Sequence, residues 1–176
     1  YLIENNDEID IVSTNKSVYG YLAISGIIEL SLQWNSCSIN TKANIGSNDG
    51  KKFVDKQKIK IKKINNNLIS QKLNYLNTRI EKIRVLEGTN FNFFSEKGKK
   101  IFFEKEFYVS KLSDRMGMRL EGENIENIFE ANIRSEGLVK GIIQVPPDGN
   151  PIIMLSDHGT IGGYPKIASV ISADYD

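Results

Sequence analysis

Two arginines, two acids and a glycine gather in one short segment, residues 113–122. A guanidinium can hold a carboxylate or a phosphate through two parallel N–H bonds, which makes Arg115 and Arg119 candidates for binding an anion. The glycine between them lets a ligand or another main chain come close. The segment therefore indicates a carboxylate or anion site. The more frequent outcome for such a cluster is that the arginines pair with Asp114, Glu121 or other acids and only stabilise a turn, and that alternative stays open.

A second cluster of reactive side chains lies at residues 156–166, among three glycines. Glycines let a ligand or a strand approach the main chain, and His158 belongs to the residue type that most readily exchanges a proton near neutral pH. The pattern indicates a binding or catalytic loop. A single histidine is more often a surface or hydrogen-bonded residue than a base, so a purely structural loop is the alternative. The other polar candidates in this cluster are Asp157, Thr160, Tyr164 and Lys166.

Residues 46–52 have only a superficial likeness to a phosphate-binding loop. That loop has four residues between its glycines and a Ser or Thr after its lysine. Here three residues separate Gly46 from Gly50, and Lys52 follows Lys51. The segment is therefore not predicted to bind a nucleotide, and any ATP is expected on a partner chain or in a different kind of site.

The cysteine and histidine content bounds the chemistry further. Cys37 has no nearby basic residue in the sequence to lower the pKa of a thiol, so a buried, inert thiol is predicted. One cysteine and one histidine cannot form a zinc site by themselves, so no metal is expected in this chain. The single cysteine also fits a reducing compartment, and we expect a cytoplasmic protein.

Size and charge exclude several classes of partner. A chain of 176 residues with 40% hydrophobic content can bury one core of ordinary size, which predicts a single domain over residues 1–176. Lys and Arg total 23 against 22 Asp and Glu, so no strong field favours nucleic acid or an acidic membrane. No apolar run reaches the roughly 20 residues that span a bilayer. We therefore expect neither a nucleic-acid nor a membrane partner.

Short apolar patterns predict strands in preference to helices. Lysine and isoleucine alternate over residues 58–62, which places the isoleucines on one half-buried face and the lysines in solvent. The glycine-bounded apolar run at residues 20–26 is typical of a buried strand. Further strands are predicted at residues 80–86 and 106–110, and residues 36–50 are predicted to form a loop.

The clearest local prediction is a hairpin near the end of the chain. Two apolar runs, residues 141–145 and 152–156, flank a turn that contains proline and Asp-Gly. Ser95 is predicted to cap a short helical turn before an aromatic pair, and the phenylalanines around it are predicted to lie in the core. No amphipathic helical period lasts beyond about three turns. These patterns together predict a mainly β protein, built as a barrel.

Four segments follow one another in a recognisable order: residues 113–122, 135–137, 141–149 and 162–168. Together they resemble the family of C subunits of bacterial 5-oxoprolinase, also described as KipA-like, as allophanate hydrolase subunit 2 and as the biotin-dependent carboxyltransferase family. The likeness extends to residues 20–26 and 36–50, and so over nearly the whole chain. It implies a cyclophilin-like β-barrel with few short helices. It also implies a longer protein, with residues expected before Tyr1 and after Asp176.

The resemblance implies a component of an ATP-dependent amidohydrolase complex. The complex would convert 5-oxoproline to glutamate with two partner proteins, one KipI-like and one LamB/YcsF-like, and this piece alone would be inactive. ATP is implied for the complex as a whole. One alternative is a regulatory protein that antagonises a KipI-like kinase inhibitor. Another is a carboxyltransferase-like or allophanate- or urea-processing domain, in which biotin would take part although the chain has no Met-Lys-Met attachment sequence.

The resemblance also implies site residues for a small carboxylate or lactam, and we expect the turns at 113–122 and 156–166 to converge at one end of the sheet around it. Catalytic candidates are Asp114, Arg115, Asp157 and His158. Substrate-binding candidates are Arg119, Glu136, Gln144, Asp148, Thr160, Tyr164 and Lys166.

Two segments depart from the family pattern. His158 and Gly159 stand where the family usually has Arg and Gln, and Cys37 stands where it usually has Arg. Each change removes a guanidinium or an amide that could hold an anionic group. Either a different substrate or loss of activity follows from the resemblance at these positions.

Overall fold

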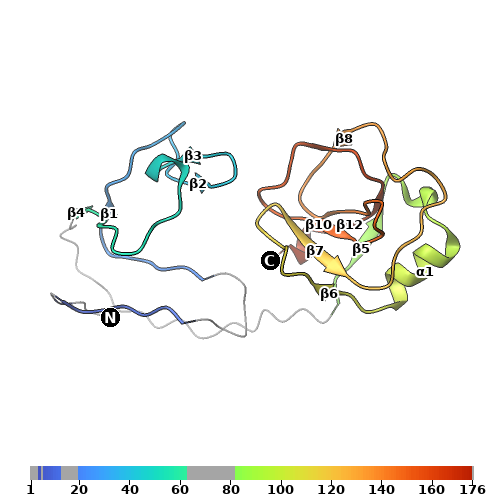
Figure 1. Ribbon diagram of the computed structural model, residues 1–176, viewed down its shortest axis with the longest axis horizontal. Coiled ribbons are helices and arrows are strands. Elements are labelled where there is room, and N and C mark those ends of the chain that lie inside the picture. Colours follow the sequence, from blue (N-terminus) through green and yellow to red (C-terminus); the bar gives the residue numbers. More distant parts are fainter. Residues whose placement is uncertain (1–3, 5, 13–19, 63–81, 176) are drawn as a thin grey trace. The chain divides into compact units, whose positions relative to one another are not determined.

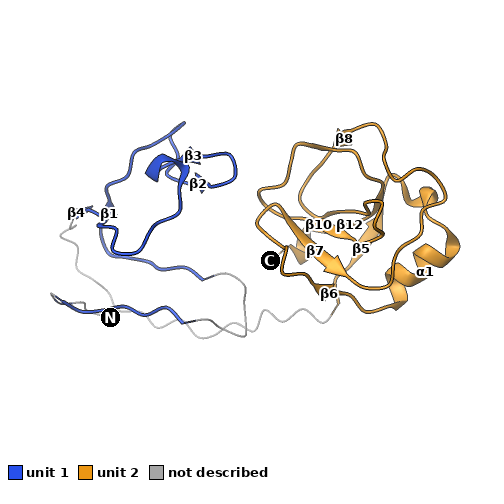
Figure 2. Ribbon diagram, in the orientation of Figure 1, with its two compact units in different colours: residues 1–73 blue, residues 74–176 orange. Residues whose placement is uncertain are grey.

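The protein is mainly β, with one α-helix and short strands (Figure 1) in the part of the chain that the computed structural model describes, residues 4, 6–12, 20–62 and 82–175. The mainly β class predicted from the sequence is thereby confirmed. The chain divides into two compact units, residues 1–73 and 74–176 (Figure 2). Each unit is described by itself, and the prediction of one domain over residues 1–176 stays a prediction.

Unit 1 is built from short antiparallel pairs. Strand β1 (Ile27–Ile28) pairs with β4 (Ile61–Lys62), and β2 (Ile39–Asn40) pairs with β3 (Ile45–Gly46). A 3-10 turn, η1 (Asn48–Gly50), follows β3. Among the described residues of this unit only Ser47 and Gly50 are buried. Hydrogen bonds, and not a buried apolar cluster, therefore hold these described segments together.

Four predictions for unit 1 are wrong. Residues 20–26 form no strand and Tyr21 is 97% exposed, because an apolar run needs a pairing partner before it becomes a strand. The segment predicted as a loop, 36–50, contains β2 and β3. The isoleucines of residues 58–62 lie on no buried face, since Ile59 is 41% and Ile61 is 45% exposed. Cys37, predicted to be buried, is also exposed.

Unit 2 holds a six-stranded antiparallel sheet with the strand order β5-β12-β9-β10-β7-β6. Strands β5 and β6 are its edges among the described residues, so this sheet is open and the predicted closed barrel is not formed there. Closure requires the two edge strands to pair with each other. The strand bounds are β5 Val85–Glu87, β6 Tyr108–Val109, β7 Gly117–Glu121, β9 Ile142–Gln144, β10 Ile152–Met154 and β12 Lys166–Val170.

The predicted hairpin is present. Strands β9 and β10 pair antiparallel, with Ile152 opposite Gln144 and Ile153 opposite Ile143. The strand predicted at 106–110 is confirmed as the shorter β6. The strand predicted at 80–86 begins at Val85 and continues to Glu87, while residues 80 and 81 lie outside the described residues.

One face of the sheet packs on the helix α1 (Glu96–Glu104) and the segments around it. Phe94 and Val145 are fully buried at the centre of this core, which confirms that aromatic side chains near Ser95 are internal, although Phe103 is 57% exposed. The 3-10 turn η2 (Phe91–Phe93) leads into α1. The cluster consists of Phe94, Ile101, Ile125, Ile143, Val145, Ile167, Ala168 and Val170.

The other face of the sheet is more polar. Directly opposed residues in an antiparallel ladder point to the same side, so the paired residues Arg119, Ile152, Gln144 and Lys166 form one row across four strands. Of the four, only Ile152 joins a hydrophobic cluster, a small one with Leu138 and Met154 that is separate from the main core.

A two-stranded ribbon and a final turn complete the unit. Strand β8 (Glu136–Gly137) pairs antiparallel with β11 (Ile161–Gly162), and the 3-10 turn η3 (Ser172–Asp174) precedes Tyr175. Arg84 and Asp174 form an ion pair at 2.6 Å, which ties η3 to the residues before β5. Of the helices in the described ranges, none has the length and apolar character needed to traverse a bilayer.

Replacing Ser95 with alanine tests the local origin of α1. The Ser95 Oγ accepts a hydrogen bond from the Gly98 N–H at 3.0 Å, so it satisfies a donor in the first turn of the helix. Ser95→Ala is expected to lower the free energy of unfolding by about 1 kcal/mol in chemical denaturation. The matched control is Ser156→Ala at an exposed position, which should change it by less than about 0.5 kcal/mol. Equal effects of the two substitutions would contradict the cap.

Candidate functional site

The deepest charge in unit 2 is the ammonium group of Lys166. Its side chain is 4% exposed, and its Nζ donates to Glu136 Oε2 at 2.5 Å. A buried charge without a partner would be strongly destabilising, so this carboxylate is what makes burial of the lysine possible. Hydrogen bonding to Lys166 holds the pKa of Glu136 below its usual value against the opposing effect of burial. Both partners were substrate-binding candidates from the sequence, and the structure brings them together.

The carboxylate reaches the lysine because the ribbon β8–β11 carries it there. Glu136 in β8 lies opposite Gly162 in β11. A side chain at position 162 would place its Cβ 2.8 Å from Gln144 Nε2 and 2.8 Å from Leu138 Cδ1. Glycine at this position lets β11 lie against the polar face without moving the ends of the Gln144 and Leu138 side chains.

A β-bulge directly follows the lysine. The register between β12 and β9 shifts between Lys166 and Ala168, and Val145 N–H donates to the Pro165 carbonyl at 2.9 Å just before the shift. Lys166 and Ile167 alternate as neighbours in a strand do, with Lys166 opposite Gln144 in the polar row and Ile167 in the apolar core. The bulge breaks the alternation after them, so that Ile167 and Ala168 both lie in that core.

Gln144 lines the same place. It is 3% exposed, and its Nε2 donates to the Tyr164 carbonyl at 2.9 Å. Lys166, Glu136, Gln144 and the main chain of Tyr164 thus form one site, which we call the lysine site. Arg119 belongs to the same row of the sheet, three strand spacings of about 4.8 Å each from Lys166.

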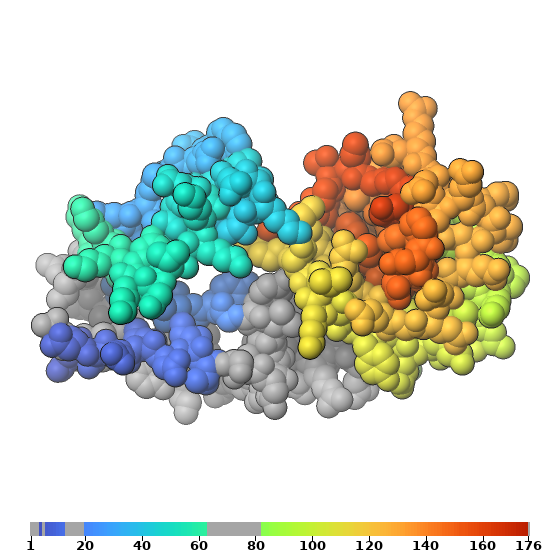
Figure 3. Space-filling model, viewed as in Figure 1, coloured from blue at the N-terminus to red at the C-terminus, as the bar shows by residue number. Residues whose placement is uncertain are grey.

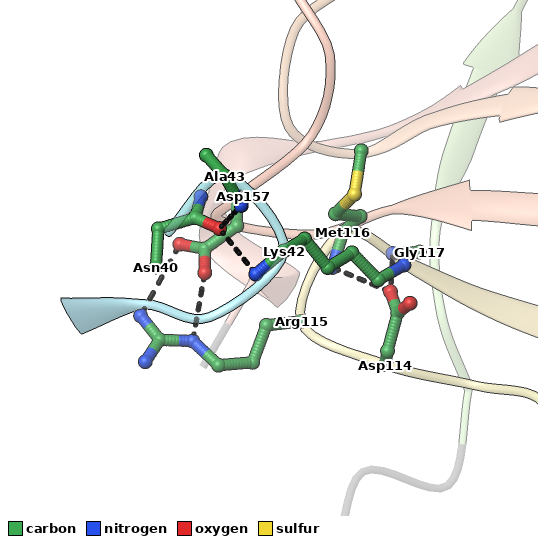
Figure 4. A network of polar contacts seen from close by, with 8 residues as sticks. All are labelled: Asn40, Lys42, Ala43, Asp114, Arg115, Met116, Gly117 and Asp157. Atoms are coloured by element: carbon green, nitrogen blue, oxygen red, sulfur yellow. Dashed lines mark hydrogen bonds and ion pairs between the residues drawn. The ribbon is translucent and has the colours of Figure 1, made fainter. Parts of the chain in front are cut away.

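The two glycine-bearing turns lie together, as expected. Arg115 Nε contacts Asp157 Oδ2 at 2.9 Å and Arg115 Nη2 donates to Asp157 Oδ1 at 3.2 Å (Figure 4), a bidentate pair. The Asp157 N–H also donates to the Arg115 carbonyl at 3.0 Å. The turn that holds Arg115 reaches the surface of unit 2, where residues 113–122 are yellow in Figure 3.

Asp114 stabilises its own turn. Its Oδ1 accepts hydrogen bonds from the Met116 N–H at 2.8 Å and the Gly117 N–H at 3.2 Å (Figure 4). The arginine of this turn is therefore paired with an acid of the other turn. This agrees with the structural alternative, in which an acid of the chain takes up the guanidinium of Arg115.

The remaining candidates are spread over the surface. His158 Nδ1 lies 2.6 Å from the Gly159 carbonyl, and since a carbonyl only accepts, this nitrogen carries the proton. Thr160 is exposed. Asp148 is exposed and accepts from the Asn150 N–H at 3.1 Å, which stabilises the hairpin turn. None of these contacts joins the lysine site.

One residue of the lysine site was missed from the sequence. Asn90 is 7% exposed, and its Oδ1 accepts the main-chain N–H of Lys166 at 3.0 Å. It lies 76 positions before Lys166 in the chain. Asparagine is common in this sequence, and nothing in the local pattern separates this one from the others.

No group of three or more His, Cys, Asp or Glu side chains is placed to hold a metal ion within the described ranges. The groups at the lysine site are a cation, a carboxylate and amides, which can hydrogen-bond in both directions and exchange protons.

Lowering the pH tests the charge pair. Because the folded-state pKa of Glu136 lies below its ordinary value, its ionised form stabilises the fold at neutral pH, and this contribution is lost as the pH falls below the ordinary carboxyl range toward the folded-state pKa. Glu136→Gln should lower stability at neutral pH and flatten the acid branch of a plot of unfolding free energy against pH. The control Glu130→Gln, at an exposed position, should leave the plot unchanged. Parallel acid branches for Glu136→Gln and wild type would contradict the pairing.

The packing around Lys166 can be tested with alanine at two glycines. A Cβ at Gly88 would lie 2.2 Å from the Lys166 carbonyl oxygen, whereas nothing lies within 4 Å of one at Gly137. Gly88→Ala should destabilise the protein by about 1–3 kcal/mol, as overpacking of a tight contact does, and Gly137→Ala by much less. Thermal unfolding of the two variants measures this difference in stability. A Gly88→Ala protein as stable as wild type would show that the turn has room to move.

Comparison with known proteins places the chain in a family. The model of the "carboxyltransferase domain, subdomain A and B" matches residues 1–176. The chain is 34% identical over 155 residues to the C subunit of 5-oxoprolinase from Escherichia coli, covering 88% of this chain and 50% of that protein. It is 30% identical over 175 residues to the C subunit of 5-oxoprolinase from Haemophilus influenzae, covering 99% of this chain and 56% of that protein. The chain therefore spans about half the length of the curated relatives it matches.

Solved structures show the same fold. The crystal structure of the Kluyveromyces lactis urea carboxylase superposes with a TM-score of 0.67 at 20% identity, over 87% of this chain and 16% of that one. At this identity the likeness concerns the fold alone. Together with the family match over the full length given, these findings confirm the resemblance seen in the sequence, and the chain belongs to the family of carboxyltransferase domains, subdomain A and B.

Proposed function

We propose that this chain is part of the C subunit of a 5-oxoprolinase, a complex that opens the lactam of 5-oxoproline to glutamate at the expense of ATP. Two relatives that are named as C subunits of 5-oxoprolinase support the proposal. The observation that carries it structurally is the buried ammonium of Lys166 paired with the partly exposed carboxylate of Glu136. In this reaction water adds across the amide C–N bond of the ring, and hydrolysis of ATP supplies the free energy.

The lysine site has the chemistry to hold a lactam. A five-membered ring keeps its amide cis, so the C=O acceptor and the N–H donor lie along one edge. Lys166 Nζ, a donor, and Glu136 Oε2, an acceptor, lie 2.5 Å apart and present the complementary edge. The amide of Gln144 adds a further hydrogen-bonding group beside them.

A further residue is proposed for the carboxylate of the substrate. 5-Oxoproline carries a carboxylate next to the ring nitrogen, and a cation is its natural partner. Arg119, in the same row of the sheet as Lys166, is the proposed partner of that carboxylate. Thr160, Tyr164, Asp148 and the turn residues Asp114, Arg115, Asp157 and His158 are proposed only as groups that border the site or shape its approach.

The other parts of the proposal concern the complex. ATP, a KipI-like partner and a LamB/YcsF-like partner belong to the proposed assembly, and a cytoplasmic location goes with it. The relatives' names describe one of several subunits, which supports a multi-subunit enzyme.

A second candidate is a carboxyltransferase-like, urea-processing domain, which the family model and the fold of urea carboxylase favour. The cyclic urea of biotin has the same cis-amide edge as a lactam, so Lys166 and Glu136 would fit it as well. When bound, biotin would supply a carrier for the carboxyl group. The two residues would then orient the ring through the hydrogen bonds described for the lactam.

Activity of the assembled complex tests the proposal. The full-length protein, together with its KipI-like and LamB/YcsF-like partners, should hydrolyse ATP only when 5-oxoproline is present and should release glutamate. Lys166→Met and Glu136→Gln should each lower kcat/KM by at least about 100-fold, since each removes a group that hydrogen-bonds the reacting amide. Lys97→Met, an exposed lysine in α1, is the matched control and should retain full activity.

Thermal unfolding of each variant shows whether it is folded, so that loss of activity can be assigned to the site. Turnover that depends on biotin and not on 5-oxoproline would favour the second candidate. Binding to the KipI-like partner without any turnover would sink both enzymatic candidates in favour of a regulatory protein.

A further inference from the structure

The turn after β5 lies directly against the first residue of β12. Gly88 N–H donates to the Ile167 carbonyl at 2.9 Å, and Asn90 N–H donates to the Lys166 carbonyl at 3.2 Å. The Lys166 N–H in turn donates to the side-chain Oδ1 of Asn90 at 3.0 Å. Asn90 therefore binds both main-chain polar groups of the lysine.

The hydrogen bonds of Asn90 take the place of strand pairing beyond the end of β5. Strand β5 pairs with β12 only from Ala168 to Val170, and β5 stops at Glu87. In an antiparallel ladder two opposed residues exchange N–H and C=O bonds in both directions. Beside Lys166 the main-chain N–H of Asn90 gives one of these bonds, and its side-chain carbonyl takes the place of the main-chain carbonyl for the other. The ladder is thus extended by one residue past the β-bulge.

The same side chain also affects the carboxylate. The pKa of Glu136 is lowered chiefly by the hydrogen bond to Lys166, and Asn90 adds a smaller hydrogen-bonding contribution in the same direction. The Oδ1 of an amide only accepts and its Nδ2 only donates. One planar group can therefore accept from the lysine main chain and donate to the glutamate. Among the described residues, the charged group that Glu136 faces is Lys166.

We propose that Asn90 is the positioning residue of the lysine site: it fixes the main chain of Lys166 and orients Glu136 through the two ends of a single side-chain amide. Its effect on turnover rests on the proposed function, but its effects on the geometry and the titration of the pair do not. The turn has no slack, since a Cβ at Gly88 would lie 2.2 Å from the Lys166 carbonyl oxygen. Displacing Asn90 therefore displaces the lysine.

Two substitutions separate the functions of the amide. Asn90→Ala removes both the acceptor and the donor, leaving the buried Lys166 N–H without its partner. Asn90→Asp is isosteric and keeps an oxygen for that N–H, but it loses the donor and places a second carboxylate beside Glu136. The matched control is Asn92→Ala, the same residue type two positions away in η2 and exposed.

The readout is the titration of Glu136, followed by carboxyl-carbon NMR in the full-length protein. The apparent pKa of Glu136 should rise in Asn90→Ala and rise further in Asn90→Asp, because a like charge nearby opposes ionisation. In the assembled complex both variants should lose roughly 100-fold in kcat, the scale expected of a misplaced catalytic group, with a smaller change in KM. The control should match wild type in both measurements.

Unchanged titration of Glu136 in Asn90→Asp would overturn the proposal, even in a variant that loses stability. So would a wild-type kcat in a folded Asn90→Ala complex. If the wild-type complex shows no turnover that depends on 5-oxoproline, the proposed function fails, and the titration of Glu136 alone then decides the role of Asn90.

Discussion

Burial of the Lys166 ammonium is the constraint on which the rest of unit 2 depends. Taking one unpaired charge out of water costs several kcal/mol, a large fraction of the roughly 5–15 kcal/mol by which a typical protein is stable. The fold therefore has to deliver a carboxylate to this one point. It does so with β8, which brings Glu136 within 2.5 Å of Lys166. The glycine at 162 fits the same arrangement, because a side chain there would require the ends of Gln144 and Leu138 to move.

The two faces of the six-stranded sheet have different roles. The face under α1 holds the large apolar cluster around Phe94 and Val145, which gives the strands a rigid support. The opposite face is left with a polar row and only a small cluster around Leu138. Neighbouring residues at the start of β12 contribute to both faces: Ile167 lies in the core and Lys166 lies in the polar row. A site on rigid strands can hold a donor and an acceptor at a fixed separation, which a loop cannot do as well.

Features with local signals could be predicted from the sequence, and features made by distant contacts could not. The β9–β10 hairpin and the Ser95 cap depend on residues a few positions apart, and both were predicted. Lys166 was named as a candidate of the glycine-rich segment 156–166, but Glu136 was predicted only through family resemblance, since their pairing joins positions 30 residues apart. Asn90 has no local signal and was missed. The strand expected at 20–26 failed for the same reason, because an apolar pattern does not say whether a pairing partner exists.

Two of the charge pairs of unit 2, Arg115–Asp157 and Lys166–Glu136, differ in how deeply their cations are buried. Arg115 is 61% exposed and its pair with Asp157 is open to water, where such pairs contribute about 0–1 kcal/mol and are screened by salt. Its bidentate geometry joins the turn before β7 to the turn after β10, so it sets the spacing of two loops. The Lys166 side chain is only 4% exposed, so its ammonium depends on Glu136 as a partner, although the Glu136 side chain itself is 45% exposed. An incoming amide edge that replaces the Lys166–Glu136 hydrogen bond has to satisfy both groups at once. That requirement favours a ligand with a donor and an acceptor side by side over a simple anion.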